Sequence, residues 1–307
     1  MMKIGYFNKL LACCLIIIAI VSCIDDNNAN CIMCYVSVSS KDSTGKVLPL
    51  NLMINLRAYL FKNGKFERIV TAEPDGKYLL NYDSRMDSVS LVMIGTSEKD
   101  SLVMHTPDEG DDIGSMATGV KYDSVKEQYI LPSSLYYGVY NYTSHKSVNN
   151  ITWANIVLIN KPVTVRVVIR QLKETFGEGP YRVVLSGFRN FMSFTGESKG
   201  DSITYSPKFK FDMDDQLVTD AVRSLPSMIG EHLTVSVYKS QSGKKSESRI
   251  SGLTSQQLLI SADRDETGKY VSLCSGDNKV VIIDFNSKNI TMSVIPWNEY
   301  IRNIVIP

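Results

Sequence analysis

Residues 52–70 read LMINLRAYLFKNGKFERIV, and this stretch decides the fold class. Apolar side chains recur at every second position, as in a half-buried β-strand, at Leu52, Ile54, Leu56, Ala58 and Leu60. Asn63-Gly64 follows, the pair that most readily supplies the two positive φ angles of a type I′ hairpin turn. Residues 66–70 are then expected to return beside the first strand. The stretch therefore predicts antiparallel β-structure.

The same period of two recurs along the rest of the chain. It predicts short strands over residues 35–39, 78–82, 89–94, 163–169, 181–185, 233–238, 280–285 and 290–295. Residues 95–128 are rich in Asp, Ser, Gly and Thr and are predicted to be mainly loop. Two short helices are predicted, over 216–225 behind an acidic N-cap at 212–215, and over 253–262.

This pattern favours β-sandwiches over a parallel α/β sheet, because the strands are short and regularly spaced. Comparable series of strands stand before and after Pro162. The sequence therefore predicts an all-β protein with few short helices. Its two sandwich domains are expected at residues 35–160 and 161–307.

Residues 1–22 are predicted to be a lipoprotein signal peptide. Lys3 and Lys9 precede an uncharged apolar run at 10–21 that is shorter than the ~20 residues a membrane-spanning helix needs. The run ends in Ile20-Val21-Ser22-Cys23, which resembles a lipobox, so Cys23 is the predicted lipidation site. An ordinary signal peptide with a chance cysteine is the alternative.

The residues behind Cys23 are expected to form a tether over 23–34. Asp25 and Asp26 resemble the surface-export signal of Bacteroidetes lipoproteins. A lipid-bearing cysteine would hold the protein in the outer membrane without a spanning helix. The predicted location is therefore the outer membrane, lipid-anchored and exposed at the cell surface.

Three further cysteines follow, Cys31, Cys34 and Cys274. They permit at most one internal disulfide, either a local bridge between the first two or one of these with Cys274. A redox motif of the thioredoxin type needs a strand before it and a helix after it, which the predicted elements do not supply. Zinc-ligand partners at suitable spacing are absent from the sequence.

Composition and motifs give no sign of catalysis. The chain has 33 basic and 32 acidic residues, so nothing indicates a nucleic-acid partner. The acidic residues 108–112 do not follow the order of a known calcium loop. No nucleophile elbow, phosphate loop or zinc-protease motif is present. The three histidines stand apart from other ligand-forming residues, at His105, His145 and His232. We therefore predict no enzyme activity, no metal and no cofactor.

An Asp-Ser pair followed by an aliphatic residue or threonine occurs five times. This triplet resembles the O-glycosylation acceptor pattern of exported Bacteroidetes proteins, and a turn that starts a strand explains it equally well. The intact mass of the native protein decides between the two. The candidate acceptors are Ser43, Ser88, Ser101, Ser124 and Ser202.

The order of several short motifs resembles the FimB/Mfa2 family of fimbrial anchor proteins. These motifs are the lipobox, an early cysteine before the first strand, the hairpin Leu60-Phe61-Lys62-Asn63-Gly64-Lys65-Phe66, Ser134-Leu135-Tyr136-Tyr137-Gly138, Pro162-Val163-Thr164-Val165-Arg166-Val167, Tyr205-Ser206-Pro207 and a last strand before Pro296-Trp297. Family members usually carry glycine where this chain has Pro296. Because proline cannot donate a ladder hydrogen bond, the strand should stop or lie at a sheet edge there.

The resemblance implies transthyretin-like β-sandwich domains and a non-enzymatic role at the base of a pilus. The implied partners are fimbrial shaft subunits (fimbrillins), joined by strand addition. Our candidate partner contact lies in residues 290–307, at Ile290, Met292, Val294 and Trp297.

Two alternatives share the same leader. A surface glycan-binding lipoprotein would need an exposed aromatic platform, for which the candidates are Tyr136, Tyr137, Tyr140, Tyr142 and Trp153. A tip or stalk fimbrillin of the same superfamily is the other.

Overall fold

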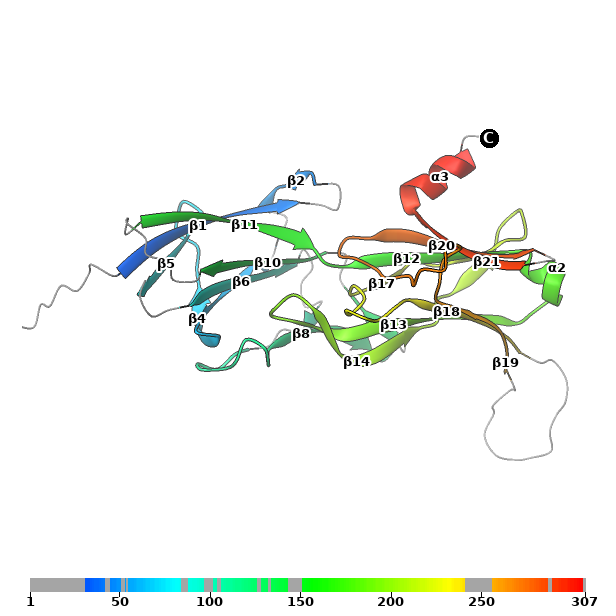
Figure 1. The fold of residues 1–307 in the computed structure, drawn as a ribbon, viewed down its shortest axis with the longest axis horizontal. Coiled ribbons are helices and arrows are strands. Elements are labelled where there is room, and N and C mark those ends of the chain that lie inside the picture. The colour runs from blue at the N-terminus through cyan, green and yellow to red at the C-terminus, as the bar shows by residue number, and fades with distance from the viewer. Residues whose placement is uncertain are drawn as a thin grey trace, which may run out of the picture.

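The protein is an elongated molecule built almost entirely of β-strands, with its N-terminal half at one end and its C-terminal half at the other (Figure 1). The structure, a computed structural model, describes residues 31–41, 45–50, 53, 55–83, 88–96, 102–103, 106–125, 128–131, 134–142, 151–240, 256–286 and 289–305. The strands of these ranges form sheets of eight, six and seven members. The predicted all-β class is confirmed; the division into two transthyretin-like domains stays a prediction.

The eight-stranded sheet makes up the N-terminal half. Its strands run in the order β2-β1-β11-β10-β6-β3-β4, with β5 also paired to β1. They are β1 (Cys31–Lys41), β2 (Val47–Leu48), β3 (Arg57–Lys62), β4 (Lys65–Val70), β5 (Tyr78–Asp83), β6 (Val89–Thr96), β10 (Leu135–Tyr142) and β11 (Ile151–Asn160). All its pairs are antiparallel except β1 with β11, which are parallel over nine positions.

Two sheets face one another in the C-terminal half. The six-stranded sheet consists of β12 (Val163–Arg170), β15 (Phe209–Phe211), β16 (Leu217–Thr219), β17 (Val222–Ser224), β20 (Asn278–Asn286) and β21 (Asn289–Pro296). The seven-stranded sheet consists of β7 (Leu102–Val103), β8 (Ala117–Asp123), β9 (Gln128–Ile130), β13 (Tyr181–Ser193), β14 (Ser198–Tyr205), β18 (Thr234–Ser240) and β19 (Gln256–Ala262). The helices within the described residues are α2 (Leu172–Phe176) and α3 (Trp297–Val305).

The sandwich core forms from residues that alternate along the facing strands. Val167 and Ile169 of β12 lie in one buried cluster with Val183 and Leu185 of β13. Thr219 is buried beside them, and its hydroxyl accepts the Val167 N–H at 2.9 Å. The hydroxyl satisfies a backbone donor that would otherwise cost about 1–3 kcal/mol to leave unpaired.

The turn of the deciding hairpin forms as predicted, since Asn63 and Gly64 have φ of 51° and 76°. The strand before it is shorter than predicted, because β3 begins at Arg57 and the described residues 53, 55 and 56 lie outside it. The strand before it is, however, buried on both faces and not only on one. Leu60 faces the N-terminal core, while Tyr59 and Phe61 face a further cluster, which also includes side chains of the C-terminal half.

That further cluster joins the two halves, and we call it the junction cluster. Phe194 lies at its centre, with ring centroids 4.8 Å from Tyr59 and 6.1 Å from Phe61. The Tyr137 hydroxyl donates to the Phe194 carbonyl oxygen at 3.2 Å. In addition, β8 pairs with β13, so residues from before the predicted boundary at 160/161 extend the C-terminal sheet. The halves are therefore coupled by both packing and strand pairing.

Both predicted helices are wrong. Residues 216–225 contain β16 and β17, and the described part of 253–262 is the strand β19. The Asp212 carboxylate does accept backbone N–H groups, from Asp214 at 3.0 Å and Gln216 at 2.9 Å. Asp215 has φ of 55°, so these bonds close a turn between β15 and β16 and not the first turn of a helix. Asp thus stabilises a turn in the way it would cap a helix.

Other boundaries also differ from the prediction. The first strand begins at Cys31 and not at Tyr35, so residues 31–34 belong to the sheet and not to a tether. Within 95–128, predicted mainly as loop, β8 is a seven-residue strand. Gly187, which interrupts β13, has φ of 92°, and a Cβ there would lie 1.9 Å from the His232 carbonyl oxygen. Only glycine fits this irregular position.

We expect Phe194→Ala to lower the free energy of unfolding by about 3–5 kcal/mol, because it opens a cavity in the junction cluster. Urea denaturation followed by tyrosine and tryptophan fluorescence measures the change. Met213→Ala, at a fully exposed position, is the matched control and should leave stability unchanged. A loss below about 1 kcal/mol for Phe194→Ala would contradict the coupling of the halves.

Candidate functional site

The last strand, β21, lies at the edge of the six-stranded sheet (Figure 1). It pairs antiparallel with β20 from Asn289 to Pro296, and no other described strand pairs with its outer side. The outward N–H and C=O groups of β21 are therefore open to a further strand. As predicted from Pro296, the strand ends at this residue and lies at an edge.

The structure does not bring the four predicted contact residues together. Ile290, Met292 and Val294 share one face of β21, because side chains alternate along a strand. That face is turned to the sandwich core, and Met292 is therefore only 4% exposed. Ile290, at the start of the strand, is 51% exposed. Trp297 lies beyond the strand, in α3. Any partner at this edge therefore meets backbone groups and Ile290, not the Met292 side chain.

Helix α3 covers the opposite face of the same sheet. Tyr300 is buried against Val280 and Ile282 of β20, and this burial raises the pKa of its phenol. The Arg166 guanidinium lies 4.1 Å from the Trp297 ring centroid, within range of a cation–π interaction. The sequence could have indicated this helix, because Trp297, Tyr300 and Ile301 follow helical spacing directly after Pro296.

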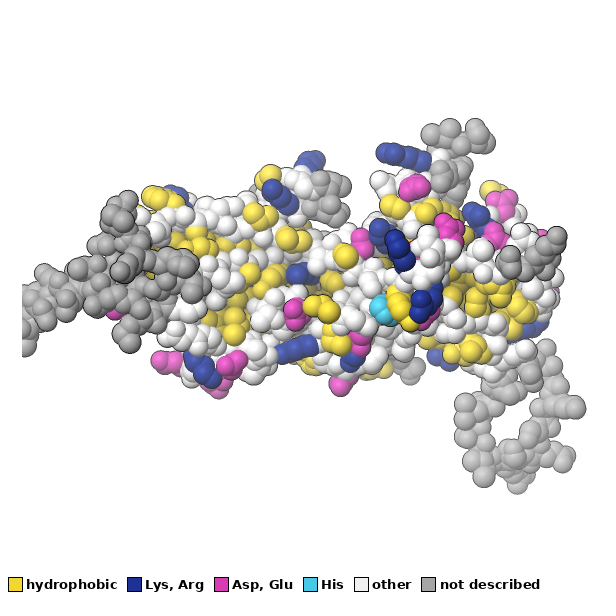
Figure 2. All heavy atoms as spheres, in the orientation of Figure 1, with side chains coloured by type: hydrophobic (Ala, Val, Ile, Leu, Met, Phe, Trp, Pro, Cys, Tyr) yellow, Lys and Arg dark blue, Asp and Glu magenta, His cyan; other side chains and the backbone are white. Residues whose placement is uncertain are grey.

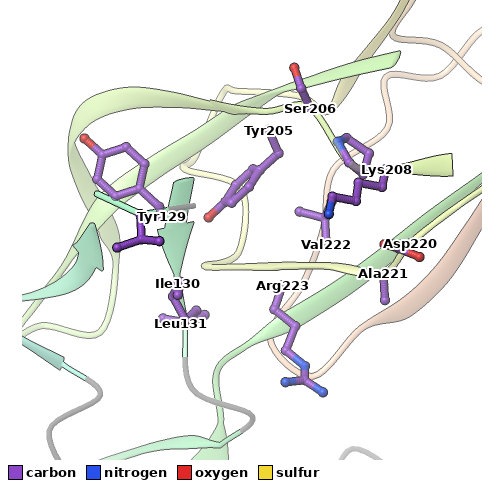
Figure 3. Close-up of a pocket in the computed structure, with 12 residues that line it drawn as sticks. Tyr129, Ile130, Leu131, Tyr205, Ser206, Lys208, Asp220, Ala221, Val222 and Arg223 are labelled. Carbon is purple, nitrogen blue, oxygen red and sulfur yellow. The ribbon is translucent and has the colours of Figure 1, made fainter. Parts of the chain in front are cut away.

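A cleft of about 790 Å³ opens between β9, the end of β14 and β17 (Figure 3). Tyr129 and Tyr205 line it together with the charged residues Lys208, Asp220 and Arg223. Burial raises the pKa of Tyr205 to about 12. The cleft was not predicted, since its walls come from three separate segments of the chain. Its lining combines aromatic surface with charge but pairs no nucleophile with a base.

Cys34 does not form the predicted disulfide with Cys274. Cys34 is buried in the N-terminal core, where its thiol donates to the Tyr140 hydroxyl at 3.7 Å. Cys274 is exposed, and both are free thiols. The side chain of Cys31 lies outside the described part of the structure, so a role for it stays a prediction.

The other predicted modification sites fall partly within the described residues. Ser88, Ser124 and Ser202 are exposed, as an acceptor must be. Cys23, Ser43 and Ser101 lie outside the described ranges, and so do His105 and His145. His232 stacks on Tyr270 with ring centroids 3.9 Å apart, which is a packing contact.

The aromatic platform required by the glycan-binding alternative does not form. Tyr136 and Tyr137 are buried, on opposite faces of β10, and Tyr140 and Tyr142 pack against the N-terminal core. Trp153 alone of the five is well exposed, at 68%. The five do not share a surface because β10 is covered on both faces near the junction of the halves.

Within the described ranges, no group of three or more His, Cys, Asp or Glu side chains is placed to hold a metal ion. No helix in the same ranges is long and apolar enough to cross a membrane. An all-β body with an open edge strand and an aromatic cleft fits the class of proteins that assemble with, or adhere to, partners.

The chain belongs to the family described as fimbrillin-A associated anchor proteins Mfa1 and Mfa2, whose model matches residues 52–303. This is a family of fimbrial anchor and adhesin-like proteins of the cell envelope, and not of enzymes. None of the curated protein sequences matches the chain.

Solved structures share the fold at low sequence identity. The fimbrial anchor protein Mfa2 from Porphyromonas gingivalis has a TM-score of 0.58 at 13% identity, over 87% of this chain and 98% of that one. Candidate polysaccharide binding proteins from Bacteroides thetaiotaomicron give 0.56 at 14%, over 87% and 96%. A candidate adhesin from Bacteroides ovatus gives 0.55 at 12%, over 87% and 93%.

We expect Trp297→Ala to destabilise the attachment of α3 by about 1–2 kcal/mol, because it removes the cation–π contact with Arg166 and the ring contact with Tyr300. Hydrogen exchange of α3 and β21 amides measures this as faster exchange. Asn298→Ala, one residue along at an exposed position, is the control and should exchange like the parent. Equal protection in both variants would show that Trp297 does not hold the helix.

Proposed function

We propose that this protein is the base subunit of a fimbria, held in the outer membrane by lipid on Cys23 and joined to the first shaft subunit by strand addition. The observation that carries the proposal is the open edge of β21. Membership of a family of fimbrial anchor and adhesin-like proteins supports it.

Strand addition fits this edge for a physical reason. The outward backbone groups of β21 lose water when covered, and an extended segment of a partner replaces each lost hydrogen bond. Ile290 adds exposed apolar surface at the start of the strand, where Thr291 is exposed as well. The Met292 side chain anchors β21 to its own core, so the edge is held in place before the partner arrives.

A lipid on Cys23 supplies the other half of an anchor. Each buried CH₂ contributes about 0.8 kcal/mol, and more than one acyl chain is needed for stable attachment. A bacterial lipoprotein cysteine carries several such chains. The residues between Cys23 and Cys31, where β1 begins, are mostly polar.

We expect lysines on the open edge to block shaft binding, as charged side chains do on natural edge strands. Thr291→Lys with Ser293→Lys should reduce the recovery of fimbrillin-like shaft proteins about tenfold or more, a loss of at least ~1.4 kcal/mol. The measurement is a cross-linking pull-down from the native outer membrane, with partners identified by mass spectrometry.

Gln257→Lys with Ser261→Lys is the matched control, because it places two lysines on another edge strand, β19. It should recover shaft proteins at the parent level. Recovery of glycan-import porins in place of shaft proteins would overturn the proposal in favour of glycan binding. Immunogold labelling at the outer end or along the length of the fimbria would assign a tip or stalk role instead.

We further expect the intact mass of the native protein to show loss of residues 1–22 and addition of acyl chains at Cys23. Cys23→Ala should release the protein from the membrane fraction. The same spectrum reports the proposed O-glycans, which would add mass that is lost on replacing Ser88, Ser124 and Ser202 by Ala. A mature mass without acyl chains would contradict the proposed lipid attachment at Cys23.

A further inference from the structure

The outer face of β1 and β11 carries an exposed apolar and aromatic surface near the start of the described chain. Because the two strands are parallel, their side chains form rows across this face. Met33 lies beside Ile151 in the first row, and Tyr35 lies beside Trp153 in the second. We call these four residues the N-terminal aromatic patch; hydrophobic side chains are visible over this end of β1 and β11 in Figure 2.

The patch is exposed to an unusual degree for its residue types. Trp153 is 68% exposed, Ile151 49% and Met33 37%. The Tyr35 and Trp153 rings stack with centroids 4.9 Å apart and an interplanar angle of 22°. The Lys77 ammonium lies 5.4 Å from the Trp153 ring centroid. Grouped exposed apolar side chains of this kind mark interaction surfaces, whereas single ones do not.

Polarity changes in order along the first three rows. On β1 and β11, apolar Met33 and Ile151 come first, the aromatic pair second, and Ser37 beside Asn155 third, while exposed Asn81 of β5 continues the first row beside Met33. Successive rows are about 7 Å apart. This is the order of a lipid–water interface, where aliphatic groups reach the acyl chains, Trp and Tyr lie at the headgroups and Lys extends its ammonium to the water.

The polar third row argues against a bound sugar. The Ser37 hydroxyl donates to the Ala154 carbonyl oxygen at 3.1 Å and also lies 3.2 Å from the Asn155 side-chain oxygen. The Asn155 amide donates to the Ser39 hydroxyl at 3.3 Å. These groups hydrogen-bond to one another, so the third row offers the aromatic rings few free polar groups to orient a pyranose.

The patch also lies near the end of the chain that carries the proposed lipid. β1 begins at Cys31, and the segment from Cys23 to Cys31 spans at most about 29 Å when fully extended. Met33 and Ile151 form the row nearest to that segment. A lipid on Cys23 would therefore keep the patch within reach of the membrane surface at all times.

We propose that the N-terminal aromatic patch lies in the headgroup region of the lipid bilayer, as a second membrane contact that sets the orientation of the protein. This inference rests on the lipid anchor proposed above. A flexible tether alone leaves the body free to tilt, whereas a second contact fixes β1 and β11 against the surface. The far end, with β21, then points away from the membrane.

The chain has only two tryptophans, so the fluorescence of each can be measured alone in a variant that lacks the other. We would reconstitute the native lipoprotein with Trp297→Phe into phosphatidylcholine vesicles, with brominated or ordinary acyl chains. Bromine quenches indole fluorescence only at short range. Trp153 should lose most of its emission in brominated vesicles and show a blue-shifted maximum in ordinary ones. The Trp153→Phe variant, which keeps Trp297, should show neither change.

Met33→Ser with Ile151→Ser should abolish the quenching of Trp153 while the protein still floats with the vesicles. Protein that floats while Trp153 remains unquenched would overturn the second contact and leave the lipid anchor standing. Protein that does not float, and whose mass lacks acyl chains, would instead remove the anchor on which the inference rests. Tyr35, Lys77 and Trp153 stay unchanged in the Met33→Ser with Ile151→Ser variant, so the ring stack is preserved there.

Discussion

The parallel pairing of β1 with β11 is the constraint on which the rest of the N-terminal half depends. A parallel pair cannot be closed by a tight turn, so the chain between β1 and β11 is a long connection that contains the other strands of this sheet. This pairing sets the rows of the outer face and places Tyr35 beside Trp153. The same arrangement recurs in the C-terminal half, where β12 pairs parallel with β20. There it leaves β21, the strand after β20, with one partner only.

The two ends of the molecule carry different surfaces. The N-terminal end carries the start of β1 and the aromatic patch, and the C-terminal end carries the open edge of β21 (Figure 1). In the proposed role, a base subunit would transmit force between a membrane and a shaft, so its two ends should not move independently. The junction cluster around Phe194 and the pairing of β8 with β13 meet this requirement, since both join the halves. The two halves are thus held together by both packing and strand pairing.

Local sequence signals predicted much of this fold and failed where the deciding contacts are distant. Asn63-Gly64 gave the hairpin, because the required φ angles depend on those two residues alone. Asp212 was read as a helix cap, because a carboxylate satisfies backbone donors equally well in a turn. The burial of Tyr59 on the second face of β3 depends on Phe194, and no period within residues 52–70 carries that information. The cleft of Tyr129 and Tyr205 was missed for the same reason.

At the candidate contact on β21, the backbone and the side chains contribute differently. Alternation correctly grouped Ile290, Met292 and Val294 on one face of β21, but the face is the one that packs on the core. What a partner strand would meet at this edge is mainly N–H and C=O groups, whose positions depend on the fold and little on residue type. The chain keeps the fold of Mfa2 at only 13% identity. An edge contact made through the backbone survives such divergence, and the choice of partner then depends on the few side chains beside the edge, among them the exposed Ile290 and Thr291.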